Sequence, residues 1–505
     1  MDWKKHSKWW VIGAAAAVIL VNAWAIYNEH LFIPFFSAAA IIAYLLLFRV
    51  DLAMYLMAFS TPFSIGLDTD KVQFDISLPA ELLMISITFL FLARICYDLR
   101  FKKDVLKHPI TIAILCYLTW MFICCITSEI PLVSFKFWAA KIWFVCSSFF
   151  MVIHLMDKDR SRWITYFNCY AIALGCIVVI TTIKNAQAGF GEHIAHWIMN
   201  PFYNDHTAYG AVLALFLPMT IGLMLLPETK RSMRVLYGIL VAIFLLGTYL
   251  SFCRAAWLSL IGAIGIWCVV KLRIKFSWFI TGATIIGALL FAFSDDILYR
   301  MSRNSQDSST NLAEHLQSIS NISTDASNVE RLNRWHAAFA MIEERPVTGW
   351  GPGCYQFCYA PYQDSRYHTI ITTDFGDGGN AHSEYIGPTA ETGFIGLFTV
   401  LALVVLVLYY GLNTYQRSRD KSVRRLCLAA TLSLITYFIH GAMNNFLDTD
   451  KLSLPFWSLF ALIVVLSIET ESKMARSSKK KSIPYSADDK KDSDPSSSLT
   501  PSSGE

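Results

Sequence analysis

Residues 330–353, ERLNRWHAAFAMIEERPVTGWGPG, lie inside a long polar stretch of a chain otherwise built mainly of hydrophobic runs. The stretch covers about 295–393; it opens with a Ser- and Asn-rich run at 301–310 and ends with GGNAHSE at 378–384. A connection of this length is usually either functional or disordered. This one contains arginine, histidine, tryptophan and patterned glycine, which a disordered linker does not need. We therefore predict that it forms half of an active site.

The composition of the chain excludes an ordinary soluble globular protein. Apolar residues make up 55% of the 505 residues and charged residues only 16%, a balance typical of a protein that crosses the bilayer many times. No CxxC pair or His/Cys cluster indicates a metal site. We expect neither a metal nor another cofactor.

Hydrophobic runs long enough to cross a bilayer recur along the chain. A spanning helix needs about 20 mostly apolar residues, and this criterion predicts an all-α polytopic fold of about 14 (12–14) transmembrane helices with one large, partly helical outer loop. The run at 51–66 is short and carries STPFS at 60–64, so it either spans the membrane or only dips into it. The predicted spans are 9–28, 31–48, 51–66, 80–97, 109–126, 137–155, 163–183, 207–226, 235–251, 255–270, 276–293, 393–412, 426–443 and 452–468.

The runs divide the chain into four parts. We predict N-terminal transmembrane helices over 1–294, the outer loop over 295–392, C-terminal transmembrane helices over 393–469 and a disordered tail over 470–505. The tail is rich in Lys, Ser, Asp and Pro and cannot bury a core. The N-terminus resembles a signal peptide, but a second hydrophobic run follows without a clear cleavage site, so we expect a retained first helix.

Basic residues predict the orientation of the helices. Cytoplasmic loops of membrane proteins carry an excess of lysine and arginine. With 14 spans, every basic loop and both termini fall on the cytoplasmic side, and the long polar loop faces outward. The basic segments are 4–8, 100–107, 158–162, 230–234, 271–275, 417–425 and 479–481.

Arg254 interrupts an apolar run, SFCRAAW at 251–257, with almost no loop around it. An arginine there can simply extend to the membrane interface. However, an ionisable residue at membrane depth is costly and is a functional hypothesis by default. Arg254 also falls on the outer side, where the charge bias would not place it, so we favour a functional role.

Two pieces of the outer loop carry further candidates. Residues 330–345 predict an amphipathic helix whose apolar face is Leu332, Trp335, Phe339 and Ile342. Arg331 and Arg334 share a different face, which could be merely solvated. Pro346 then ends the helix, and glycines at 349, 351 and 353 allow a tight turn. His382 follows in NAHSE, before the chain re-enters the membrane. A lone histidine is more often structural, but histidine can exchange a proton near neutral pH, and in a loop that also holds Arg331 we favour function.

These pieces, taken in order, resemble the O-antigen ligase and O-antigen polymerase family. They are SxxRAxW at 251–257, RLxxW at 331–335, PxxGxGxG at 346–353, AH at 381–382 and ExGxxG at 391–396. The resemblance covers roughly 201–460. The chain departs from the family pattern at Cys253, where the family often has a second serine, and at Ser383, where it often has asparagine.

The resemblance implies a GT-C-like, metal-independent glycosyltransferase of the bacterial inner (cytoplasmic) membrane, with cytoplasmic termini and a site that faces the periplasm. Such enzymes transfer a glycan from an undecaprenyl-diphosphate carrier to the hydroxyl of a glycan or lipid acceptor, in lipopolysaccharide or exopolysaccharide biosynthesis. Arg254 and Arg331 would stabilise the diphosphate leaving group, because guanidinium groups bind phosphate oxygens and stay charged. His382 would act as general base. No nucleic-acid partner is expected.

Five more residues are candidates for substrate binding. Arg334 is a reserve phosphate contact, Asn380 stands two residues before His382, and Lys141 lies one turn inside the sixth predicted span. Asn204 and His206 precede the eighth span, where the family often carries a polar patch. His440, Asn444, Asn445 and Asp448 could line the acceptor side.

Several functions remain open. Within the family these are ligase, repeat-unit polymerase and protein O-oligosaccharyltransferase. Outside it, the alternatives are a polytopic transporter or flippase of lipid-linked glycans and a non-catalytic assembly protein.

Overall fold

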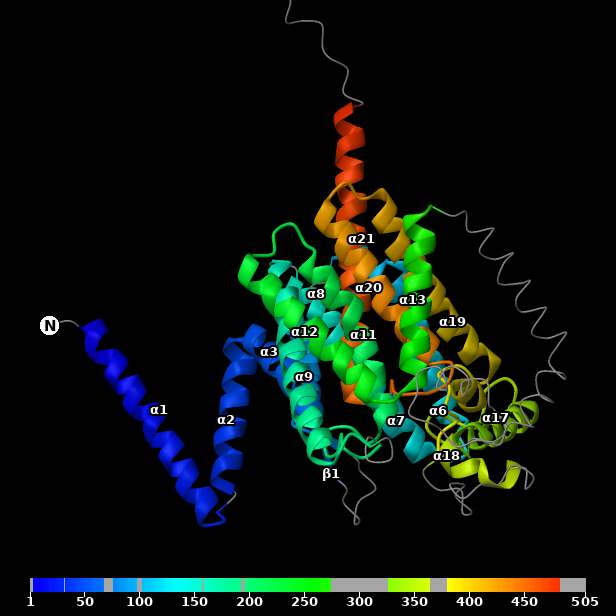
Figure 1. Cartoon of the computed structure of the whole chain (residues 1–505), viewed down its shortest axis with the longest axis horizontal. Helices are drawn as coiled ribbons and strands as arrows, with labels where there is room; N and C mark the ends of the chain where they lie inside the picture. The colour runs from blue at the N-terminus through cyan, green and yellow to red at the C-terminus, as the bar shows by residue number, and fades with distance from the viewer. Residues whose placement is uncertain are drawn as a thin grey trace, which may run out of the picture.

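The computed structural model of the chain describes residues 3–30, 32–67, 76–97, 102–156, 159–191, 196–273, 326–363 and 379–481. Within these residues the chain is almost wholly helical (Figure 1), apart from a small antiparallel hairpin of β1 (Ile65–Leu67) and β2 (Ile76–Leu78). The prediction of an all-α fold is confirmed. The predicted span at 276–293 and the polar run at 301–310 lie outside the described residues.

Ten helical stretches of the described residues are long and apolar enough to cross a membrane, and each coincides with a predicted span. The protein is therefore a multi-pass membrane protein. The number 14 stays a prediction. The ten stretches are α4 (Ala80–Tyr97), α6 (Pro109–Ile126), Pro131–Met156, α9 (Ser161–Gln187), α11 (His206–Met224), α12 (Arg231–Leu250), α13 (Arg254–Lys271), α19 (Ile386–Arg417), α20 (Lys421–His440) and α21 (Asp450–Lys481).

Three shorter apolar helical segments occupy three more of the predicted spans: Ala16–Tyr27 within α1 (Trp3–Tyr27), α2 (Phe32–Phe48) and α3 (Val50–Ser60). α3 has 11 residues, which at 1.5 Å per residue covers only about 17 Å of a bilayer core about 30 Å thick. A 3₁₀ turn at Thr61–Phe63, with Pro62 at its second position, then leads the chain into β1. The helix predicted over 51–66 thus ends early.

Two helical spans differ in detail from the expected pattern. Pro131–Met156 consists of α7 (Pro131–Val145), a π-helical segment (Cys146–Phe150) and α8 (Met151–Met156). α21 continues to Lys481, beyond the boundary at 469–470, so the start of the predicted disordered tail is helical. Its extension is supported by Lys473 and Glu469, which form an ion pair of 2.7 Å one helical turn apart. Residues 482–505 lie outside the described residues.

The loops gather at two opposite ends of the helix bundle (Figure 1). At one end Arg160, just before α9, lies 3.6 Å from Glu469 in α21. At the other end Arg345 pairs with Glu129 between α6 and α7, at 2.7 Å. The first end holds loops predicted to be cytoplasmic and the second holds loops predicted to face outward, so the grouping of these loops by side agrees with the packing. Which end faces the cytoplasm stays a prediction.

The bundle is organised around α11 and α21, whose side chains are mostly buried. Phe216 of α11, for example, stacks on Tyr170 of α9 with ring centroids 4.6 Å apart. α13 lies at the edge, and α1 and α2 project away from the bundle in Figure 1. Arg254 therefore begins a peripheral helix, next to the central α11 and α20, which both pack against α13.

The outer loop contains the predicted helix, now α17 (Ala326–Glu344), and the short α18 (Tyr355–Cys358). The predicted buried face of α17 is wrong in part, because Phe339 is 52% exposed. Ala337, Ala338 and Met341 are buried instead. The alanines let this face of the helix approach its neighbours closely, and hydrophobic periodicity gives little weight to residues so small.

The glycine turn after α17 forms as predicted. Gly349, Gly351 and Gly353 have φ of +64°, +109° and +74°, values that glycine adopts without strain. The turn docks on the start of α19: the Trp350 N–H donates to the Ala390 carbonyl at 3.0 Å, and the Gly351 N–H to the Glu391 carbonyl at 2.8 Å. The outer loop is thereby fixed to the membrane helix that follows it.

Candidate functional site

Arg254 is placed by a three-residue turn, Ser251–Cys253, between α12 and α13. Ser251 Oγ donates to the Thr248 carbonyl at 2.7 Å and accepts from the Cys253 N–H at 3.3 Å. Phe252 has φ of +51°, a conformation that is rare for a bulky residue and costs free energy. The turn is thus tight and strained, and it fixes Arg254 as the first residue of α13, at one end of the helix bundle.

Arg331, in the first half of α17, lies near Arg254. Arg254 and Arg331 are both close enough to His206, the first residue of α11, to interact with it electrostatically. Arg331 also interacts in this way with His440, the last residue of α20. The structure therefore brings together Arg254, Arg331 and His206, which are far apart in the sequence and were all proposed as site residues.

His382 is the third predicted catalytic residue, and its backbone is held by side chains. The Asn380 Oδ1 accepts a hydrogen bond from the His382 N–H at 3.0 Å. The Trp335 Nε1–H donates to the Ala381 carbonyl at 3.0 Å. His382 has φ of +48°, which is uncommon for a residue other than glycine and is one of the features that gather at functional sites.

The electrostatic surroundings keep the His382 ring neutral. Burial, reinforced by the positive charges of Arg334 and Arg331, lowers the pKa of His382 to about 3. The ring is therefore unprotonated at neutral pH and can accept a proton. An anion bound to the neighbouring arginines would offset their charge and raise this pKa again. A site loaded with a phosphate-bearing ligand would thus contain a stronger base than the empty site.

Arg334 has a different place from the one expected of a phosphate contact. Its Nε donates to Glu330 Oε1 at 2.7 Å, and both side chains are almost fully buried, 9% and 4% exposed. Its Nη1 donates to the Asn380 carbonyl at 3.0 Å. The guanidinium is thus committed to bonds within the protein. It positions the segment that carries His382.

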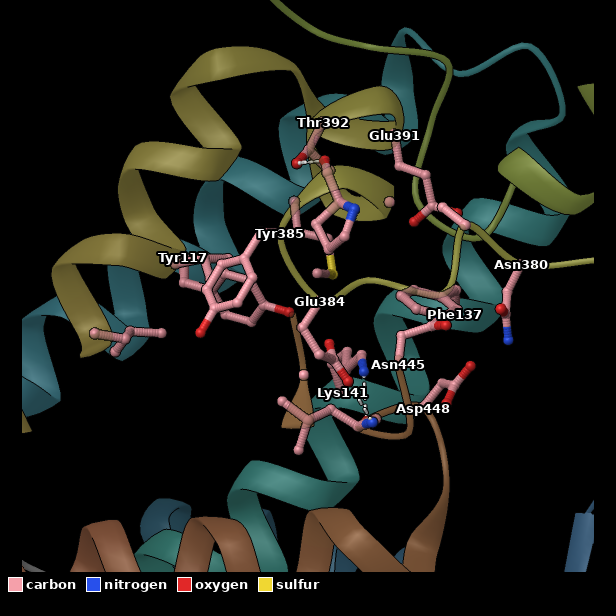
Figure 2. A pocket seen from close by; sticks show the side chains of 18 of the residues that line it. Tyr117, Phe137, Lys141, Asn380, Glu384, Tyr385, Glu391, Thr392, Asn445 and Asp448 are labelled. Carbon is pink, nitrogen blue, oxygen red and sulfur yellow. Dashed lines mark hydrogen bonds between the residues drawn. The ribbon is translucent and has the colours of Figure 1, made fainter. Parts of the chain in front are cut away.

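A cavity of about 270 Å³ lies on the other side of this segment (Figure 2). Asn380, Glu384 and Tyr385 line it, whereas Arg254, Arg331 and His382 do not. The cavity walls also include Phe137 and Lys141 of α7, Glu391 of α19, Tyr437 of α20, and Asn445 and Asp448. Residues 380–385 therefore form a partition between the arginine pair and a polar cavity.

The carboxylate of Glu384 fixes one wall of the cavity. Its Oε1 accepts from the backbone N–H of Phe446 at 2.8 Å and of Leu447 at 2.9 Å, and from the hydroxyl of Tyr437 at 2.5 Å. Lys141 Nζ donates to the Leu447 carbonyl at 2.5 Å. Figure 2 shows Glu384 and Lys141 pointing toward the same turn. The connection between α20 and α21 is thereby joined to the partition and to α7.

The end of α20 also contributes residues to both the cavity and the arginine side. Tyr437 and Gly441 line the cavity, whereas His440 faces the arginine side, where its Nε2 lies 3.5 Å from Cys253 Sγ. Cys253, the position where the family often has serine, is thus in contact with the site through His440.

The predicted substrate-binding residues other than Arg334 divide into three groups. His206 joins the arginine cluster, and its ring centroid lies 4.0 Å from that of His196. Lys141 and Asn380 line the cavity. Asn204 is exposed, and its neighbour Asp205 caps α11 by accepting from the Thr207 and Ala208 N–H groups at 2.7 Å.

Glu384, Glu391, Tyr385 and Tyr437 were assigned no role from the sequence, although Glu391 opens the ExGxxG motif. Glu384 had a usable signal, since it is an acidic residue two positions after His382 at a membrane boundary. The tyrosines had none, because aromatic residues are frequent along the whole chain. Among the described residues, no group of three or more His, Cys, Asp or Glu side chains could hold a metal ion.

The fold and the site define a multi-pass helical membrane protein whose long polar segment brings an arginine and a histidine to a second arginine at one end of the bundle. Residues 239–401 match the family model described as O-antigen ligase. The match runs from α12 into α19 and includes Arg254, Arg331 and His382, so this part of the chain is similar to the O-antigen ligase family. A comparison with curated proteins gave no match. The resemblance noted from the motifs is confirmed.

Proposed function

We propose that this protein transfers a glycan from undecaprenyl diphosphate to an acceptor hydroxyl at the outer face of the bacterial inner membrane. The observation that carries the proposal is the convergence of Arg254, Arg331 and a neutral His382 from three separate segments, inside the region that matches the O-antigen ligase family.

The reaction needs two kinds of group, and the site supplies both. When the bond between the sugar anomeric carbon and the diphosphate oxygen breaks, its electron pair leaves with the diphosphate. Arg254 and Arg331 stabilise that negative charge. The acceptor oxygen forms the new bond to the anomeric carbon, and His382 takes the proton it releases.

The cavity fits the acceptor better than the donor diphosphate. Its lining combines carboxylate, amide and hydroxyl groups with aromatic rings, including Glu384, Asn445, Tyr385 and Phe137. Such a lining can hydrogen-bond a sugar and pack against its apolar face. Because residues 380–385 separate the cavity from the arginines and His382 does not line it, an acceptor held there must extend its reacting hydroxyl past this segment to reach His382 and the donor.

A transporter or flippase is the alternative of another class. Transporter sites lie near the bilayer midplane, often at broken helices. Here Arg254, Arg331 and His382 all lie at helix ends or in the outer loop. The positive φ and the neutral ring of His382 favour the transferase over a non-catalytic assembly protein, since a purely structural segment requires neither.

The transferase assignment is tested with Arg254→Ala, Arg331→Ala and His382→Ala. Each should abolish glycan transfer from a lipid-linked donor in isolated membranes and leave the amount of inserted protein unchanged. Matched controls are His336→Ala, an exposed histidine of α17, and Arg231→Ala, an exposed arginine at the other end of the bundle. Transfer that survives all three site substitutions would overturn the proposal.

The phenotype of a deletion strain identifies the acceptor. Loss of attachment of otherwise long chains, seen on a lipopolysaccharide gel, indicates a ligase. Single repeat units indicate a polymerase. A mass loss on outer-face proteins, measured on intact proteins, indicates protein O-glycosylation.

A further inference from the structure

A second cavity, of about 340 Å³, lies at the end of the bundle opposite the candidate site. Five helix ends surround it: the end of α2, the starts of α3 and α9, and the last turns of α4 and α8. Its place along the bundle follows from Arg162, which lines it and lies two residues after Arg160, the partner of Glu469.

The lining of this cavity is strongly basic. Arg49, Arg94, Arg162 and His154 all line it, and Asp51 is the one acidic residue among the described residues that do. Asp51 is already bonded to Arg49, with Oδ1 3.3 Å from Nε. Three guanidinium groups therefore face one carboxylate.

Neighbouring acids offset the positive charge of this cavity only in part. Asp51 and Asp159 both interact electrostatically with Arg162, but the hydrogen bonds of Asp159 go to the Ser161 N–H, at 2.9 Å, and to the Ser161 hydroxyl. In the part of the chain that the structure describes, no carboxylate forms an ion pair with Arg94 or Arg162.

Other basic residues at this end of the bundle are bonded to groups of the protein. Arg160 lies 3.6 Å from Glu469, and Arg234 donates from Nε to the Met224 carbonyl at 3.2 Å. Those side chains are bonded to the protein itself. Arg94 and Arg162 are instead half-buried and line a common hollow, an arrangement suited to an anion with several oxygen atoms.

The surroundings indicate where that anion comes from. Phe48, at the rim, is 69% exposed, and Leu92 and Ile95, on either side of Arg94 in α4, are 46% and 45% exposed. Figure 1 shows α2 and α3 at the side of the bundle rather than at its centre. The basic cavity thus adjoins an apolar surface that can contact acyl chains.

We propose that this cavity binds a phosphate group at the membrane surface, carried by an anionic phospholipid whose acyl chains lie along α2 and α4. Basic pockets between transmembrane helices are typical sites for phosphorylated lipid head groups. The same phosphate chemistry could come from a soluble phosphate, and the exposed apolar rim favours the lipid. This site is separate from the glycan site and does not depend on the proposed transfer reaction.

The test uses the full-length protein, delipidated in detergent, and native mass spectrometry. The probes are dioleoyl phosphatidylglycerol, dioleoyl phosphatidylcholine and inorganic phosphate. Arg94→Gln with Arg162→Gln should weaken phosphatidylglycerol binding about 20-fold. The matched control, Arg231→Gln with Arg419→Gln, removes two exposed arginines from the same end of the bundle and should leave binding within about twofold.

Each outcome decides the proposal. Selective loss in the Arg94/Arg162 variant, with no competition from millimolar inorganic phosphate, supports a lipid site. Equal binding by that variant and its control overturns the site. Displacement of phosphatidylglycerol by inorganic phosphate overturns the assignment to a lipid and leaves a soluble phosphate as the ligand. Equal affinity for phosphatidylcholine and phosphatidylglycerol also overturns it, because recognition would then rest on the acyl chains.

Discussion

Arg334 donates a hydrogen bond of 3.0 Å from its Nη1 to the backbone carbonyl of Asn380. The bond joins α17 to the segment that carries His382, two residues further along. Asn380 in turn holds the backbone of His382, because its Oδ1 accepts a hydrogen bond from the His382 N–H at 3.0 Å. Arg334 therefore belongs to the site as a positioning residue, and Arg331, three residues earlier, is the arginine that faces the substrate in the proposed mechanism.

Removing Arg334 should affect stability and activity separately. Arg334→Met leaves Glu330 buried without its 2.7 Å ion pair, and we expect a loss of about 3 kcal/mol. Glu330→Leu combined with Arg334→Met removes both charges and should recover most of that stability. Activity should stay low in the double variant, because the Asn380 carbonyl still lacks its donor.

Thermal unfolding in detergent and glycan transfer, measured on the same preparations, check this prediction. Recovery of activity together with stability would show that Arg334 matters only for folding.

Trp335→Phe should lower kcat more than it changes KM. The substitution keeps most of the ring but removes the Nε1–H that donates to the Ala381 carbonyl at 3.0 Å. We expect a stability loss of about 1 kcal/mol and, from the displaced His382, a fall of about tenfold in kcat. Steady-state transfer kinetics measure the two constants.

The control for Trp335 is Trp267→Phe, at a partly exposed tryptophan of α13, which should leave both constants unchanged. An unaltered kcat in the Trp335 variant would mean that the bond to Ala381 does not position His382.

Much of the fold could be predicted because hydrophobic length is a physical requirement of the bilayer. Ten predicted spans coincide with long apolar helices. The predicted ends of two helices are wrong, because interactions other than hydrophobic burial determine where these helices end. α21 runs past its apolar part, where an exposed Lys473–Glu469 pair adds a small stabilisation, and α3 ends early where the chain turns into a hairpin.

Candidate site residues can be picked out of this sequence where charged and titratable groups are rare. Arg254, Arg331 and His382 stand out because charged and titratable groups are scarce in an apolar chain. The role of Arg334 could not be predicted, since its spacing from Arg331 is the same whether it binds a ligand or a buried Glu330. The position of the 380–385 partition could not be predicted from the sequence either, because it depends on hydrogen bonds from the Phe446 and Leu447 N–H groups to Glu384, which are distant in the sequence.

Gly393→Ala should destabilise the protein by about 1–3 kcal/mol and loosen the outer loop. Gly393 has φ of +70° in the first part of α19, and a Cβ there would meet the Val347 carbonyl. That contact is where the glycine turn docks, so the turn must move. Gly265→Ala is the control: it lies in a helix with nothing within 4 Å of its Cβ and should be neutral or stabilising.

Thermal unfolding and protease cleavage of the outer loop measure the effect of Gly393→Ala. Equal melting temperatures and equal cleavage rates for the two glycine variants would contradict the docking of the turn on α19.

The lowered pKa of His382 predicts how stability depends on pH. Folding lowers this pKa from an ordinary value of about 6.5 to about 3. Between these values the unfolded state binds more protons than the folded state, so stability falls as the pH decreases from 6.5 toward 3. The contribution of this histidine is fully present above pH 6.5, and its slope within the window approaches about 1.4 kcal/mol per pH unit.

His382→Gln removes this contribution and should flatten the pH dependence by that amount, whatever other groups titrate. Unfolding of the detergent-solubilised protein at pH 7, 6 and 5, with the wild type and His382→Gln side by side, measures the difference. His336→Gln, at the exposed histidine of α17, should keep the wild-type slope. Parallel curves for wild type and His382→Gln would show that the His382 ring titrates freely, and a freely titrating ring could not be the buried neutral base that the transfer mechanism requires.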